Sequence, residues 1–127
     1  MKIVLVNPPY NFMNIIRLPP LTIALLFAIL EKANFNNVEV IDFDLEFNHS
    51  KEHIDYFLNT AIEILEKKNP DVICLTCMTA QFPFVALFSK KYKKPHPETK
   101  IIVGGWMPTL NPELFFKIAD CDIIVRG

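Results

Sequence analysis

The sequence predicts an α/β protein built on a five-stranded parallel sheet. Five short apolar runs rich in valine and isoleucine alternate with four stretches that have helical character. Such alternation is typical of parallel strands joined by helices that cover both faces of the sheet. A length of 127 residues and a hydrophobic content of 51% suit one domain with a substantial core.

The expected strands are continuous apolar segments, as is typical of parallel strands buried on both faces. They span residues 2–6, 38–43, 71–76, 100–104 and 122–126. No linker, repeat or low-complexity tract separates them, and we therefore expect a single domain over residues 1–127.

Proline, capping and periodicity indicate the first two helices. Pro19 and Pro20 lead into residues 21–33, and proline is well placed at a first helical position. This helix is apolar nearly all round, so we expect it to be deeply covered. Ser50 can cap the second helix, whose apolar residues have the 3, 4, 3, 4 spacing of one buried face. These residues are Ile54, Phe57, Leu58, Ala61, Ile62 and Leu65.

Two further helices have clear boundary signals. The third begins near Ala80, carries Pro83 in its first turn and stops before Pro95. Four lysines lie near its end, where cations suit the helix dipole. Asn111 followed by Pro112 is a start signal for a short fourth helix.

Charge and hydropathy exclude several classes of function. The formal net charge is −1, so the chain lacks the basic surface that nucleic-acid binding requires. The first ten residues have none of the features of a secretory signal. The apolar run 21–30 is shorter than the roughly 20 residues of a membrane span. We therefore expect a cytoplasmic protein with neither a nucleic-acid nor a membrane partner.

The cysteines and histidines do not form a convincing metal or redox motif. Cys74 and Cys77 form a C-x-x-C, but strand residues three apart point to opposite faces, and Cys121 stands alone. We expect structural thiols. His49 and His53 are four residues apart at a helix start, yet no third ligand is evident. The sequence therefore predicts no metal site.

The carboxyl ends of the strands hold the most unusual residues, and in open parallel sheets ligands bind at this edge. A proline-rich loop, "NPPYNFMNIIRLPP", follows the first strand, and "CMTAQFP" follows the third. Gly104 and Gly105, two of only three glycines, end the fourth strand, and Gly127 follows the fifth. Adjacent glycines can leave a flat shelf for a ligand, or they can form a tight turn before the fourth helix.

Nucleotide sites are disfavoured by what this edge lacks. The first loop has no G-x-G-x-x-G, and the chain has no G-K-[ST] phosphate loop. Asn7 and Thr76 stand where a receiver domain would have acidic residues, and "NPPYNF" is not a flavodoxin phosphate loop. The remaining surface is mostly neutral. It suits a large, flat ligand with an apolar face and amide groups around it.

Five segments in order are similar to one family: "KIVLVNPPY", "RLPPLTIALLFAILEKANFNNVEVID", "PDVICLTCMTAQFP", "IIVGGWMPT" and "DIIVRG". Together they resemble the N-terminal cobalamin-binding domain of cobalamin-dependent radical S-adenosylmethionine enzymes. The resemblance implies a Rossmann-like (flavodoxin-like) sheet of order 2-1-3-4-5 with helices on both faces and a final helix missing. It also implies that this chain is part of a longer protein. The downstream domain would bind S-adenosylmethionine and an iron–sulfur cluster.

The same resemblance implies where the cofactor lies. The corrin ring would lie across the carboxyl ends of the strands, and its nucleotide tail would enter the domain. The first loop has no histidine, so cobalamin would be held without a histidine ligand to cobalt. The implied cofactor-binding residues are Asn7, Pro8, Pro9, Tyr10, Thr76, Met78, Thr79, Gln81, Gly104, Gly105, Trp106 and Gly127.

Three functions stay open. The chain is a cobalamin-binding module that is not catalytic alone, in a radical enzyme that acts as a methyltransferase or carries out related chemistry. Alternatively, it is a cofactor-free Rossmann-like domain for docking or substrate recognition, as the missing histidine would allow. A nucleotide or flavin binder is the third reading.

Overall fold

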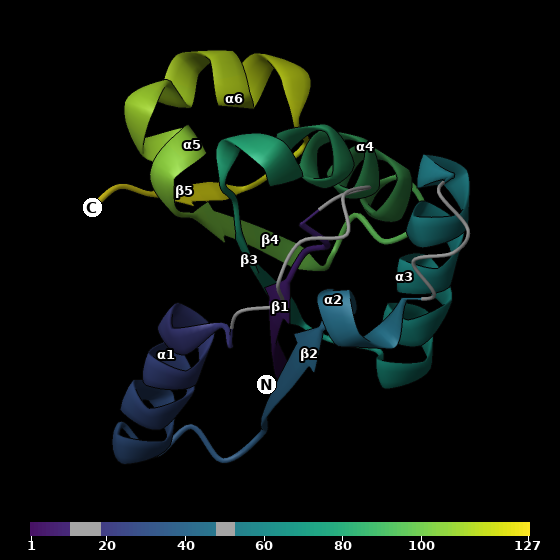
Figure 1. Cartoon of the computed structure of the whole chain (residues 1–127). Helices are drawn as coiled ribbons and strands as arrows, with labels where there is room; N and C mark the ends of the chain where they lie inside the picture. The colour runs from purple at the N-terminus through teal and green to yellow at the C-terminus, as the bar shows by residue number, and fades with distance from the viewer. Residues whose placement is uncertain (11–18, 48–52) are drawn as a thin grey trace.

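Five parallel strands form the centre of the protein (Figure 1). The computed structural model describes residues 1–10, 19–47 and 53–127. The strands are β1 (Ile3–Asn7), β2 (Val38–Asp42), β3 (Val72–Thr76), β4 (Lys100–Gly104) and β5 (Ile123–Val125). Their spatial order is β2-β1-β3-β4-β5, and every neighbouring pair is parallel. The predicted flavodoxin-like α/β fold is confirmed.

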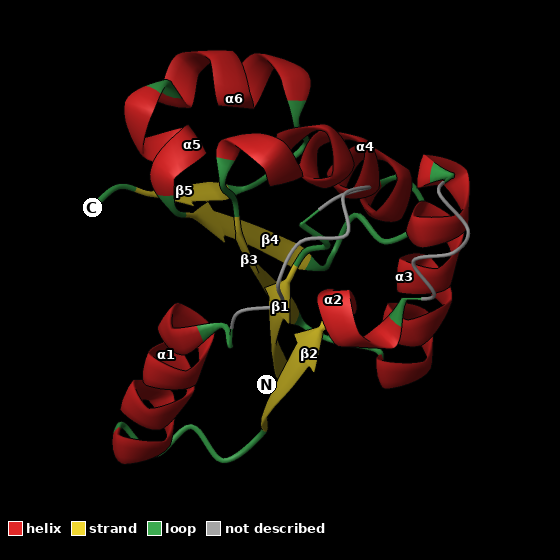
Figure 2. Cartoon of the chain, in the orientation of Figure 1, coloured by secondary structure: helices red, strands yellow, loops and turns green. Residues whose placement is uncertain are grey.

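The helices connect the strands largely as expected (Figure 2). They are α1 (Leu21–Lys32), α2 (Phe43–Glu46), α3 (Ile54–Lys68), α4 (Phe82–Lys93), α5 (Trp106–Leu110) and α6 (Pro112–Ile118), with a 3-10 turn, η1 (Thr79–Gln81), before α4. The short helices α2 and α5 were not predicted. The expected cap Ser50 lies outside the described residues.

Local chemistry explains where the helices begin and end. Asn111 Oδ1 accepts a hydrogen bond from the backbone N–H of Leu114 at 3.1 Å and so caps α6, as predicted. Pro83 lies in the first turn of α4, and lysines occupy its last turn, where they favour the negative end of the helix dipole. Asn69 ends α3 in the left-handed conformation, with φ at 47°.

One face of the sheet is fully covered. Strand residues that point to this face pack against α3, α4 and α6, and most of them have no exposed surface. Phenylalanine and tyrosine rings fill the space beneath the helices, for example Phe84 and Phe88, whose stacked rings have centroids 5.8 Å apart. Burial of large aromatic side chains supplies much of the hydrophobic stabilisation of such a core.

The opposite face is covered only in part. α1 packs through Ile23 against Ile3 and Leu5, so it covers the β1 and β2 side of the sheet. Over β5, Ile123 and Val125 are 48% and 54% exposed. We call the strip of this face over β3, β4 and β5 the open face. Figure 1 shows α1 alone on its side of the sheet, away from α3 and α4.

The prediction that the first helix is deeply covered is wrong. Leu21, Leu25 and Ile29, which recur every four residues along α1, are 76%, 61% and 52% exposed. Only one side of α1 contacts the sheet, and nothing in the described part of the chain packs on the other sides. A helix that is apolar all round normally has partners on several sides, so its composition alone overestimated its burial.

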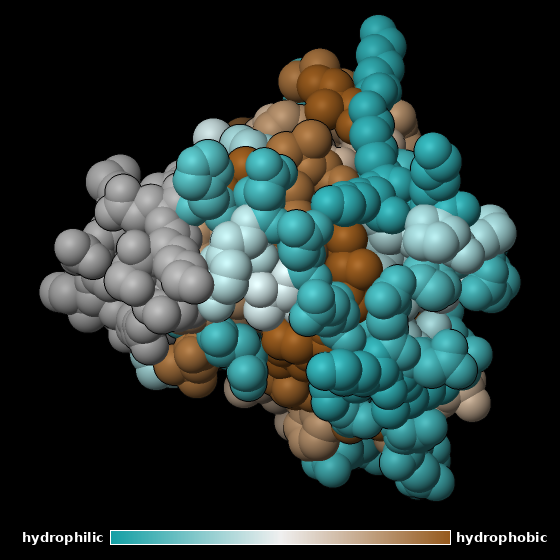
Figure 3. Space-filling view, turned by 90° about the vertical axis from the view of Figure 1, so that its right-hand side faces the viewer, coloured by the Kyte–Doolittle hydropathy of each residue, from teal (hydrophilic) through white to brown (hydrophobic). Residues whose placement is uncertain are grey.

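The surface over α3 has a different character. Figure 3 shows mostly hydrophilic side chains on this face, with hydrophobic ones visible between them.

Within residues 1–10, 19–47 and 53–127, no helix has both the length and the hydropathy of a membrane span.

Asp122 joins three elements at the amino-terminal side of the last strands. Its Oδ2 accepts from Lys93 Nζ at 2.6 Å and from the backbone N–H of Ile101 at 2.9 Å. Its Oδ1 accepts from Lys100 Nζ at 3.2 Å. Burial alone would raise the pKa of this carboxyl, but the three hydrogen bonds outweigh burial and lower the pKa to about 2.

Asp122→Asn is expected to lower the free energy of unfolding at pH 7 by about 1.5–3 kcal/mol, because hydrogen bonds to a charged group are lost. The depressed pKa of Asp122 means that its contribution is present above the unfolded-state pKa and disappears as pH falls toward 2. The variant should therefore lose less stability than the parent on acidification. Urea unfolding at a series of pH values measures both effects. Asp120→Asn, the same charge change at an exposed neighbour, is the control, and equal stability of parent and Asp122→Asn at pH 7 would contradict this account.

Candidate functional site

The carboxyl ends of β1, β3 and β4 lie side by side at one edge of the sheet. Thr76 is paired with Gly104 in the β3–β4 register, and Leu75 with Val6 in the β1–β3 register. Because adjacent strands are about 4.8 Å apart, the ends of β1 and β4 are separated by about 10 Å. We call the residues that follow these three strands, 7–10, 76–81 and 104–109, the rim.

Gln81 connects two parts of the rim. Its side chain is 1% exposed, at the end of η1. Gln81 Nε2 donates to the carbonyl oxygen of Pro8 at 2.8 Å and to Asn7 Oδ1 at 3.3 Å. Gln81 Oε1 accepts from the backbone N–H of Met78 at 2.9 Å. Every polar atom of this buried amide therefore has a partner, and the loops after β1 and β3 are joined.

The turn after β2 extends this set of hydrogen bonds. Asp42 Oδ1 accepts from Asn7 Nδ2 at 2.9 Å and from the backbone N–H of Asp44 at 3.0 Å. Asp44 Oδ1 in turn accepts from the backbone N–H of Tyr10 at 2.8 Å. Asp42 and Asp44 are not among the residues predicted for the site. The available signal was their D-x-D spacing at a strand end, where Asp42 caps α2.

Gly105 is required by the fold itself. Its φ is +107°, a conformation that residues with a side chain rarely adopt. A Cβ here would lie 3.0 Å from the backbone nitrogen and oxygen of Cys77. Hydrogen bonds hold these segments together, since Cys77 N donates to Gly104 O at 2.8 Å and Met107 N to Cys77 O at 3.0 Å. At this glycine the tight-turn interpretation is therefore sufficient.

Gly104 is different, because nothing in the described chain requires glycine there. Its φ lies outside the positive range, and a Cβ would meet only Val125, at an ordinary 3.7 Å. Gly104 and its pair partner Thr76 are both half-buried, at the top of the open face. The missing side chain leaves space between the rim and this face that a Cβ would fill. The interpretation of the glycines as a flat shelf for a ligand is therefore supported at Gly104. At Gly105 the tight turn already explains why the residue is glycine.

The remaining predicted residues divide into buried and exposed ones. Pro8 and Pro9 are buried, whereas Thr79 is exposed. Three large side chains of the rim face solvent: Tyr10, Met78 and Trp106, which are 44%, 40% and 58% exposed. Gly127 is exposed beyond β5, and its N–H donates to Thr109 Oγ1 at 3.3 Å. The exposed part of the rim thus includes three large, largely apolar side chains.

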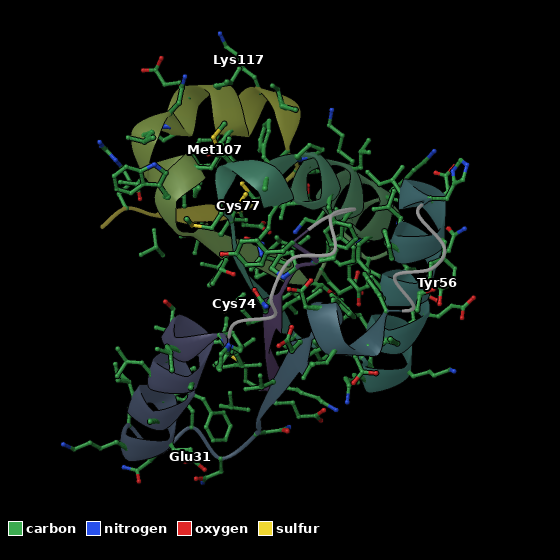
Figure 4. The ribbon with its side chains drawn as sticks, in the orientation of Figure 1. Glu31, Tyr56, Cys74, Cys77, Met107 and Lys117 are labelled. Carbon is green, nitrogen blue, oxygen red and sulfur yellow. The ribbon has the colours of Figure 1, made fainter. Side chains whose placement is uncertain are left out.

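The cysteines have the arrangement predicted for structural thiols. Figure 4 shows Cys74 on the side of the sheet toward α1 and Cys77 on the side toward α5. The two residues belong to different core clusters, which confirms that they point to opposite faces. Burial raises the pKa of Cys74 to about 11 and that of Cys77 to about 12, so neither is a ready thiolate.

Neither of the two histidines that the structure describes is part of the rim. His53 is exposed and precedes α3, and His49 lies outside the described residues. His96 is half-buried and stacks on Tyr92 with ring centroids 4.7 Å apart. Among the residues that the structure describes, no three His, Cys, Asp or Glu side chains are grouped closely enough to hold a metal ion.

The comparison with known families identifies the class of protein that this fold and edge define. A model of the B12 binding domain matches residues 17–127. The chain therefore belongs to the B12-binding domain family. The match includes Thr76, Gln81 and Gly104, whereas β1 and the residues 7–10 precede it. A search of the curated proteins found no match to this chain.

The adjacent glycines predict opposite responses to the same substitution. Gly105→Ala should lower the free energy of unfolding by about 1–3 kcal/mol, because a side chain is strained at φ +107°. Gly104→Ala should leave it unchanged or raise it by about 0.5–1 kcal/mol, since glycine weakens a strand. Urea unfolding of both variants measures the difference. Similar destabilisation by the two changes would show that Gly104 is also needed for packing.

Proposed function

We propose that this chain binds cobalamin at the rim, with the corrin ring across the carboxyl ends of β1, β3 and β4. The single observation that carries the proposal is the space above the open face at Gly104, in a chain of the B12-binding domain family. The position is the one at which parallel α/β sheets bind ligands.

The residues of the rim fit a broad macrocycle with amide substituents. On the exposed surface of the rim, Tyr10, Met78 and Trp106 offer apolar contact. Threonine hydroxyls of the rim can hydrogen-bond to amides. The two carboxylates nearest to it, Asp42 and Asp44, already accept hydrogen bonds from backbone N–H groups. The site therefore has the mixed apolar and neutral polar character that such a ligand needs.

The open face fits the nucleotide tail of the cofactor. Below Gly104 and Thr76, the half-buried side chains of Cys74 and Ile102 follow along the strands, with Val125 beside them. Apolar strand surface that no described residue covers can pack against a planar base. The tail would then lie beside the sheet on the face that carries α1, and Gly104 would be its point of entry.

We further propose that cobalamin is held here without a histidine ligand to cobalt. The support is the composition of the first loop, residues 7–20, which contains no histidine. When bound, the cofactor supplies methyl-transfer or redox chemistry at cobalt. The residues of this chain would bind and orient it and exclude water from its lower face.

The catalytic partner in this proposal is a radical S-adenosylmethionine domain of the same, longer protein in the cytoplasm. S-adenosylmethionine and an iron–sulfur cluster would belong to that domain. The support is the resemblance of the ordered motifs and the exposed apolar side chains on the rim, which suit contact with another domain.

A docking domain without cofactor is the second candidate. The exposure of Leu21, Leu25 and Ile29 on α1 favours it, since such side chains commonly mark contact surfaces. The two functions differ in the role of Gly104, which lies in β4 and not on α1, and a ligand-binding measurement separates them.

Gly104→Val should weaken binding of hydroxocobalamin by about 10- to 100-fold, because a branched side chain would fill the space into which the ligand enters and overpacking costs about 1–3 kcal/mol. The shift of the corrin absorbance on titration measures the affinity. Ala28→Val, which adds the same branched side chain on the exposed side of α1, is the matched control and should bind like the parent.

Three outcomes would contradict the proposal. The parent chain could retain no corrinoid, which would favour the docking function. Gly104→Val could bind as tightly as Ala28→Val, which would place the ligand elsewhere. Yellow colour and fluorescence of the purified chain would indicate a flavin instead.

A further inference from the structure

We propose that Gln81 is a positioning residue of the rim, which holds the loops after β1 and β3 in one arrangement before any ligand arrives. The inference rests on the proposed function, because its consequence is tighter binding of cobalamin. It starts from the most buried polar side chain at the carboxyl edge, whose hydrogen bonds all join it to residues of the rim.

The hydrogen bonds of this group have only one consistent direction. A carboxylate can only accept, so the atom of Asn7 that faces Asp42 must be the donor Nδ2. The other end of the Asn7 amide, Oδ1, then faces Gln81, which must present its donor Nε2. Gln81 Oε1 is thereby directed to the Met78 N–H. The carboxylate of Asp42 thus fixes the Asn7 amide, and the Pro8 carbonyl and the Met78 N–H fix the Gln81 amide in the orientation that agrees with it.

Two side chains, Gln81 and Asn7, link the segments that follow three strands. Gln81 contacts Pro8 and Asn7 in the first loop and Met78 in the third. Asn7 passes the connection to the turn after β2. These contacts position two exposed side chains of the proposed site, Tyr10 and Met78, which flank the end of β1 and the end of β3. A site whose rim residues are already held in place loses less conformational entropy on binding.

Gln81→Glu tests this role with little change of shape. An ionised glutamate can still accept from the Met78 N–H, but it can no longer donate to Pro8 O or Asn7 Oδ1, so the measurements are made at a pH where the carboxyl is ionised. In the ligand-free protein, we expect the Tyr10 amide to exchange with solvent at least about tenfold faster, because a hydrogen bond that holds its loop is lost. The Met78 amide should keep its protection.

The same variant should bind hydroxocobalamin about tenfold more weakly. Ser89→Ala is the matched control, since Ser89 is also a fully buried polar residue, with its Oγ 3.0 Å from both Ala86 O and Asp120 N, but it lies in α4. This control should lower thermal stability without changing Tyr10 exchange or affinity. Gln81→Met, which keeps the volume and loses every hydrogen bond, serves if the glutamate variant does not fold, and it should loosen both amides.

Two results would overturn the inference. One is Tyr10 exchange that is as slow in both Gln81 variants as in the parent, which would mean that Gln81 does not hold the first loop. The other is faster exchange with unchanged affinity, which would mean that the loop is not part of the binding site. If the parent chain itself takes up no hydroxocobalamin, the proposed function fails, and the amide exchange alone decides whether Gln81 holds the two loops together.

Discussion

Parallel pairing of β1, β3 and β4 is the constraint on which the candidate site depends. Parallel strands direct all of their carboxyl ends to the same edge, so loops that are far apart in the sequence meet there. Asn7 and Gln81 are 74 positions apart along the chain, yet they share a hydrogen bond. The rim is therefore a product of strand direction, and its polar residues can satisfy each other only because the strands agree in direction.

The two faces of the sheet have different consequences for function. The face under α3, α4 and α6 is filled by aromatic and aliphatic side chains that are buried in the described part of the chain. The face under α1 is open over β4 and β5, where apolar side chains remain exposed. A cofactor with a flat ring and a long tail needs both an edge and a surface beneath it. In this protein the edge and the open face meet at Thr76 and Gly104.

The adjacent glycines show that one residue type can have two physical roles in successive positions. Gly105 allows a backbone conformation and a close approach to Cys77 that a side chain would prevent. Gly104 has ordinary space around it, so its lack of a side chain matters for what lies outside the chain. Gln81 has a third role at the same edge. Its hydrogen bonds to Met78 and Pro8 join the segments that follow β3 and β1. Backbone shape, empty space and ordered loops thus occur together at one edge.

The sequence by itself determined the fold class, the strand positions and the edge at which the unusual residues gather. These follow from local physics: apolar runs form buried strands, Asn111 and Pro112 start a helix, and alternation of strand and helix imposes parallel pairing. Only the tertiary structure decided which glycine is structural, that α1 is exposed on most of its surface, and that Asp42 and Asp44 hydrogen-bond to residues of the rim. These properties depend on which neighbours surround a residue in space. The hydrophobic pattern records that a side chain can be buried, but it does not record whether a partner is there to bury it.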